Sequence, residues 1–161
     1  MPDPIDTDIE IQSPAKALAK VRPENGVLLV EDDPDMQWRL ARLLTLSGAR
    51  VVGTSSGEAA LAVIEQWPAD LVLIDQSLPG MSGLEIARKI RALHPGMPVV
   101  LMSSEENADL RLAAKIAGAV ELLIKPFRIE SISEIFARLK QAVAAGVASN
   151  EPPREELAAA E

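Results

Sequence analysis

The chain has 161 residues, and its 24 acidic and 16 basic side chains give a formal net charge of −8. It has no cysteine and one histidine, which excludes disulfides, a thiol nucleophile and a zinc site built from Cys and His. The acidic balance and the aromatic content of 2% are wrong for direct nucleic-acid binding, which needs a basic surface or a stacking platform.

Residues 1–24 contain four prolines and no sustained apolar pattern, which predicts a flexible N-terminal arm. This acidic start is unlike a signal or transit peptide, and no apolar run approaches the roughly 18 residues of a membrane span. We therefore expect a soluble, cytoplasmic protein that does not contact a membrane. Residues 147–161 are rich in Ala and Glu, which predicts a flexible acidic tail and leaves residues 25–146 as the folded domain.

Within that domain, short apolar runs alternate with amphipathic stretches. The apolar runs are too short for helices and predict five buried strands, in chain order residues 27–30, 50–54, 71–74, 99–102 and 120–124. The stretches between and after them predict helices with recognisable caps and breakers. In chain order, the first four run from Asp33-Pro34 to Gly48, from Ser55 or Ser56 to about Trp67, from Ser82 to about His94, and over 108–117 before Gly118. A last helix is marked by Ile132, Ile135, Phe136, Leu139 and Val143.

Apolar residues recur at helical spacing in these stretches. The first expected helix carries Met36, Leu40, Leu43 and Leu44, and the third carries Ile86, Ile90 and Leu93. Five βα units with continuously apolar strands indicate a parallel sheet that helices cover on both faces. Because crossovers are right-handed, the expected fold is a doubly wound five-stranded α/β sandwich of the flavodoxin-like or CheY-like kind. In such a sheet, ligands bind beyond the carboxyl ends of the strands, at the switch in strand order.

Polar residues follow the carboxyl ends of four expected strands, which a core alone does not require. Glu31 and Asp32 follow the first strand, Asp75 the third, Ser103 the fourth and Lys125 the fifth. If these ends converge, the carboxylates and the lysine carry a summed charge of −2, and Mg²⁺ bound by oxygen would relieve the repulsion. A carboxylate beside Mg²⁺, a lysine and a hydroxyl can accept a phosphoryl group.

The chain resembles the response-regulator receiver domains of the CheY-like kind. The matching segments are VLLVEDD, LVLIDQSLPGMSGLEI, VVLMSS and LLIKPF, in this order and at suitable separations over about residues 26–143. The resemblance implies that Asp75 accepts phosphate from a histidine kinase or a histidine phosphotransfer protein. It also implies that Asp32, Asp75 and the main-chain carbonyl of Ser77 bind Mg²⁺, with Glu31 acting through water. Lys125 would pair with the phosphoryl group, and Ser103 would be the hydroxyl that moves toward it.

The sequence departs from the family pattern at three positions. Leu122 stands three residues before the lysine, where the family often has Tyr or Phe. Ser103 replaces the commoner Thr, and Ser104 replaces the commoner Ala. We therefore expect phosphorylation to be retained and the change to be read out without an aromatic ring on the fifth strand. Ser104 is the alternative to Ser103 as the switch hydroxyl.

Two other functions compete with phosphoacceptor signalling. A receiver-like scaffold would bind a partner without being phosphorylated, and an Asp-nucleophile phosphatase would need a second Asp where Ser77 stands. We expect the protein to catalyse only its own phosphorylation and dephosphorylation and not to be an enzyme in the wider sense. Only about 15 residues follow the last expected helix, which predicts a stand-alone receiver that acts through a downstream protein partner.

Overall fold

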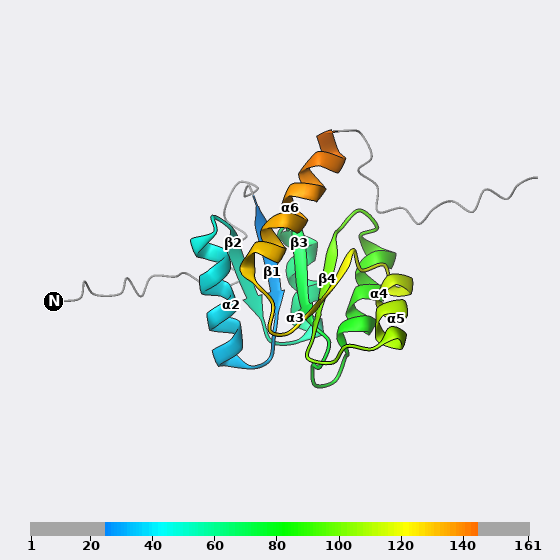
Figure 1. The fold of residues 1–161 in the computed structure, drawn as a ribbon. Coiled ribbons are helices and arrows are strands. Elements are labelled where there is room, and N and C mark those ends of the chain that lie inside the picture. The colour runs from blue at the N-terminus through cyan, green and yellow to red at the C-terminus, as the bar shows by residue number, and fades with distance from the viewer. Residues whose placement is uncertain (1–24, 145–161) are drawn as a thin grey trace, which may run out of the picture.

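Strands and helices alternate along the chain in this computed structural model, which describes residues 25–144 (Figure 1). The strands are β1 (Gly26–Val30), β2 (Arg50–Thr54), β3 (Leu71–Asp75), β4 (Val99–Ser103) and β5 (Glu121–Ile124). The helices are α2 (Pro34–Leu46), α3 (Gly57–Gln66), α4 (Gly83–Leu93), α5 (Ala108–Ala117) and α6 (Ile129–Ala144). All five expected βα units are present, and strand starts differ from the predicted ones by one residue at β1 and β5.

The five strands are all parallel and lie in the order β2-β1-β3-β4-β5. β1 pairs with β2 on one side and with β3 on the other, so the winding direction reverses between β1 and β3. Val30 lies opposite both Thr54 and Ile74, which means that the carboxyl ends of three strands finish at one level. The predicted doubly wound α/β sandwich is confirmed.

Helices cover both faces of the sheet, as Figure 1 shows. Leu28 and Val30 of β1 pack on one face with residues of α3, α4 and α5. Val27 and Leu29 point to the other face and pack with residues of α2 and α6. All four side chains have no exposed surface. This burial on both faces explains why the strands read as continuous apolar runs.

Side chains cap the first turns of α2, α3, α4 and α5, and three of these caps lie at polar starts that the sequence predicted. The Asp33 carboxylate accepts hydrogen bonds from the N–H groups of Asp35 and Met36, at 2.9 and 3.3 Å, so this residue acts as a helix cap. Ser56, rather than Ser55, caps α3, and Ser82 caps α4. Asn107 caps α5, a role that the sequence interpretation did not assign.

Two leucines of the predicted apolar stripes are exposed. Leu43 is 45% exposed and Leu93 is 60% exposed, whereas Leu40 and Leu44 are buried. Neighbouring helix positions lie about 100° apart around the axis, so Leu43 points away from the sheet when Leu44 points toward it. The stripe in contact with the core is therefore narrower than the apolar composition of α2 suggests.

The predicted flexible segments, residues 1–24 and 147–161, lie outside the described residues. Within residues 25–144, no helix combines the length and the apolar character that crossing a membrane requires.

Candidate functional site

Three carboxylates gather at the carboxyl end of the sheet, beside the switch between β1 and β3. Glu31 and Asp32 directly follow β1, and Asp75 is the last residue of β3. One carboxylate oxygen from each lies within 4.8 Å of the others. Glu31 and Asp75 are buried, at 2% and 7% exposure, and Asp32 is exposed. The structure therefore brings together the three acidic residues that the sequence placed at one site.

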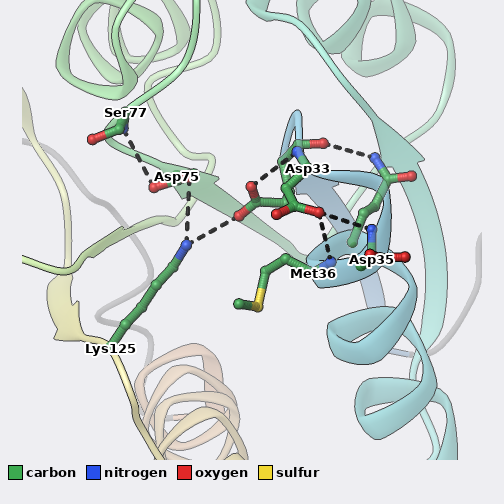
Figure 2. Close-up of polar contacts among 8 residues, drawn as sticks. Asp33, Asp35, Met36, Asp75, Ser77 and Lys125 are labelled. Atoms are coloured by element: carbon green, nitrogen blue, oxygen red, sulfur yellow. Dashed lines mark hydrogen bonds and ion pairs between the residues drawn. The ribbon is translucent and has the colours of Figure 1, made fainter.

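Lys125 forms ion pairs with both buried carboxylates, and Figure 2 shows the one with Asp75. Its Nζ lies 3.1 Å from Glu31 Oε2 and 3.4 Å from Asp75 Oδ2. Lys125 follows β5, and its main-chain N–H donates to the Ser103 carbonyl at 2.7 Å, which extends the pairing of β4 with β5. One ammonium group neutralises only part of three carboxylates, so the cluster keeps the net negative charge expected from the sequence.

Burial raises the pKa of Glu31 above its ordinary value, and the negative charge of Asp75 acts in the same direction. The hydrogen bond from Lys125 and the one from the Asp33 N–H, at 3.1 and 3.2 Å, oppose this shift and lower the pKa. The direction of the net shift shows that two donors do not fully offset the loss of water around this carboxylate.

The donor set suits a hard divalent cation. Three carboxylates within 4.8 Å offer only oxygen ligands, which Mg²⁺ prefers. The Asp32 side chain is exposed to solvent, and among residues 25–144 no other side chain forms a hydrogen bond or an ion pair with its carboxylate. Asp32, Asp75 and Glu31 could together hold a cation at this site, and Lys125 contacts the last two of them.

Each oxygen of the Asp75 carboxylate has a defined partner. The Ser77 N–H donates to Oδ1 at 3.3 Å, and Lys125 approaches Oδ2 (Figure 2). Ser77 itself is exposed in the loop between β3 and α4. These two contacts orient the Asp75 carboxylate, and Ser77 lies on the exposed side of the site.

Ser103 ends β4 and is 4% exposed, whereas Ser104 is exposed. The Ser103 hydroxyl accepts a hydrogen bond from the N–H of Glu105 at 3.0 Å, so it is engaged with the start of the β4–α5 loop. Leu122 is buried in β5, opposite Leu101 of β4. Of the two serines, only Ser103 is buried, and it lies at the carboxyl end of β4.

Gly83 is a site residue that the sequence interpretation missed. A Cβ added there would lie 2.6 Å from the carbonyl oxygen of Asp75. Only glycine allows the first turn of α4 to approach the end of β3 this closely. A glycine at the first position of a helix, directly after a serine cap, was the available signal.

Residues 27–137 match the family described as the response regulator receiver domain. The response regulator protein FleR of Pseudomonas aeruginosa is 38% identical over 112 residues, which cover 70% of this chain and 24% of FleR. The probable transcriptional regulatory protein TcrX of Mycobacterium tuberculosis is 33% identical over 106 residues, covering 66% of this chain and 45% of TcrX. The chain thus spans less than half the length of these two relatives.

Solved structures agree with this match. The response regulator protein TrrA from Thermotoga maritima, in complex with Mg²⁺-BeF, aligns with a TM-score of 0.65 and 28% identity over 71% of this chain and 98% of TrrA. A CheY-like receiver domain protein from Methanospirillum hungatei aligns with a TM-score of 0.70 and 25% identity over 76% of this chain and 99% of that protein. With the family match extending from β1 into α6, the chain belongs to the response regulator receiver domain family of two-component signalling.

Proposed function

We propose that the protein is a phosphoacceptor module that takes a phosphoryl group onto Asp75 from a histidine kinase or a histidine phosphotransfer protein. The observation that carries this proposal is the Asp75 carboxylate, which is buried, oriented by Ser77 and placed against Lys125 and two further carboxylates. A turn-forming Asp at a strand end needs none of these partners.

In the proposed reaction, an Asp75 oxygen attacks the phosphorus of a phosphohistidine. The new bond is an acyl phosphate P–O bond, the P–N bond breaks, and the imidazole leaves with the nitrogen electron pair. Lys125 neutralises charge on the transferred group, and the Ser103 hydroxyl donates to one of its oxygens. Water later cleaves the acyl phosphate and returns the free carboxylate, so the protein acts on its own side chain and not on a separate substrate.

Mg²⁺ fits the donor set and is the proposed cofactor. Asp32, Asp75 and the Ser77 main-chain carbonyl would hold it directly, with Glu31 contributing through water. When bound, it supplies positive charge that offsets both the carboxylates and the transferred phosphoryl group. We expect the protein to act in the cytoplasm, where Mg²⁺ is the usual divalent cation, and to signal through a downstream protein.

Intact mass spectrometry after incubation with acetyl phosphate and Mg²⁺ tests the proposal. Wild type should gain the mass of one phosphoryl group, and Asp75→Asn should gain none. Asp35→Asn is the matched control, because Asp35 is an exposed acid on the neighbouring helix α2 and should label as wild type does. If wild type fails to label, the protein is better described as an unphosphorylated scaffold that binds a partner. If Asp75→Asn labels as wild type does, the acceptor is another residue and the assignment of Asp75 is wrong.

A further inference from the structure

The acidic loop after β1 is held by the side chain of Gln37, on the first turns of α2. The Gln37 Nε2 donates to the main-chain carbonyl of Glu31 at 3.0 Å and to that of Thr54, the last residue of β2, at 2.8 Å. The Glu31 N–H also donates to the Thr54 carbonyl at 3.0 Å. One amide group therefore ties the residue before Asp32 to both α2 and the end of β2.

The loop after β3 is held by a second glutamine, Gln76, which directly follows Asp75. The Gln76 Oε1 accepts from the N–H of Leu84 at 2.9 Å, in the first turn of α4. The main chain of Gln76 adds two hydrogen bonds, accepting from the Gly83 N–H at 3.2 Å and donating to the Met102 carbonyl at 2.8 Å. These contacts fasten the segment that carries Asp75 to α4 and to β4.

We propose that Gln37 and Gln76 are positioning residues that hold the two acidic loops at the spacing that Mg²⁺ requires. This inference rests on the proposed metal binding at Asp32 and Asp75. Like charges within 4.8 Å repel one another, so without restraint the loops would separate whenever no cation is bound. Loops that are already held in place lose less conformational freedom on binding the ion, and this preorganisation raises affinity.

Gln37 acts through the NH2 group of its amide, and Gln76 acts through its amide oxygen. Substitution by glutamate therefore removes the hydrogen bonds of one residue and keeps that of the other, while it adds the same charge to both. Gln37 acts as a donor to two carbonyl oxygens, and Gln76 acts as an acceptor from one N–H. A glutamate has no donor when ionised but keeps its acceptors. Gln37→Glu therefore removes both hydrogen bonds and places a carboxylate against two carbonyl oxygens, whereas Gln76→Glu keeps the hydrogen bond from Leu84.

The test is calorimetric titration of Mg²⁺ into the metal-free protein and its variants. Gln37→Met, Gln37→Glu and Gln76→Met should each raise the Mg²⁺ dissociation constant about tenfold, the lower end of the effect of residues that support metal ligands. Gln76→Glu should bind Mg²⁺ with the wild-type affinity or more tightly, because the glutamate still accepts the hydrogen bond from Leu84. Gln66→Met is the matched control, because Gln66 is exposed at the end of α3. The Mg²⁺ dissociation constant of this variant should equal that of wild type.

Amide hydrogen exchange of the metal-free proteins gives a readout that is independent of the ion. Exchange at the Leu84 N–H should accelerate in Gln76→Met, stay slow in Gln76→Glu and stay slow in Gln37→Met. Slow exchange in β3 verifies that each variant is folded.

Two results would overturn the inference while wild type still binds Mg²⁺. One is wild-type affinity in both methionine variants. The other is an equal change in affinity in the two glutamate variants, which would mean that added charge and not the lost donor sets the affinity. Failure of wild type to bind Mg²⁺ would instead refute the proposed metal site, and the positioning role would fall with it.

Discussion

The ammonium group of Lys125 lies 3.1 Å from the Glu31 carboxylate, although 94 positions separate the two residues in the chain. The contact joins the ends of β1 and β5, which are not neighbours in the sheet, because β3 and β4 lie between them. Lys125 thus reaches across the carboxyl end of the sheet over Asp75, which it also contacts. The ion pair therefore links the loop after β5, at the edge of the sheet, to the loop after β1, at the switch in strand order.

Replacing Lys125 by Met should destabilise the metal-free protein, because Glu31 is 2% exposed and would lose its charged partner. We expect a loss of about 2 kcal/mol in the free energy of unfolding, less than for a fully buried pair because Lys125 retains some exposure. Urea denaturation in the presence of a chelator measures it. The same substitution in a Glu31→Gln background should cost clearly less, and equal costs in the two backgrounds would contradict a direct interaction.

Replacing Asp32 by Asn should raise the melting temperature of the metal-free protein, because one of three crowded carboxylates is removed. Mg²⁺ should then raise the melting temperature of this variant less than that of wild type, since a ligand has been lost. Asp109→Asn changes an exposed acid on α5 and serves as the control. Equal Mg²⁺-induced shifts in wild type and Asp32→Asn would count against Asp32 as a ligand.

The raised pKa of Glu31 predicts a pH dependence of stability. A carboxyl group with a higher pKa in the folded chain favours folding at low pH, and this stabilisation is lost as the pH rises through the raised pKa. Glu31→Gln stays neutral, so its free energy of unfolding relative to wild type should grow as the pH rises. Urea denaturation without metal, from about pH 4 to pH 8, would show it.

The control for this pH series is Glu134→Gln, which changes an exposed carboxyl on α6. Its stability relative to wild type should be nearly independent of pH. A flat or falling difference for Glu31→Gln over the same range would show that burial does not dominate the titration of Glu31.

Replacing Gly83 by Ala should destabilise the protein, because the added Cβ would lie 2.6 Å from the Asp75 carbonyl oxygen and 2.8 Å from the Gln76 Cα. Both neighbours are main-chain atoms, so the loop itself must shift, at a cost of about 1–3 kcal/mol. Gly96→Ala is a matched control, because a Cβ there meets nothing within 4 Å. Thermal unfolding of both variants checks the prediction, and equal stabilities would contradict it.

Activation should be reported through residues 103–109. A Ser103 hydroxyl that turns to donate to a phosphoryl oxygen must give up its present hydrogen bond from the Glu105 N–H. Leu122, an aliphatic side chain on β5, cannot report the move by burying a ring. Beryllofluoride, a phosphoryl mimic, should therefore shift the amide signals of residues 103–109 most strongly.

Ser103→Ala should still be phosphorylated but should show smaller beryllofluoride-induced shifts over residues 103–109. The other interpretation of the acids at 105, 106 and 109 is that they only stabilise the start of α5. Shifts concentrated around Leu122 and β5, with residues 103–109 unaffected, would exclude this account of the switch.

Local patterns in the sequence determined the elements and much of the site. The apolar runs predicted all five strands, and Asp33-Pro34 predicted the start of α2, because strand burial and helix capping depend on residues close together in the chain. The parallel βα order also placed Glu31, Asp32 and Asp75 at one edge, since parallel strands end on the same side.

Only the tertiary structure decided which groups touch one another. The register of five strands sets the Glu31–Lys125 distance and buries Ser103 while leaving Ser104 exposed. The side-chain contacts of Gln37 and Gln76 have no local signature, because their partners are main-chain groups that become neighbours only after the helices pack on the sheet. The exposure of Leu43 likewise depends on the rotation of α2 about its axis, which packing against the sheet determines.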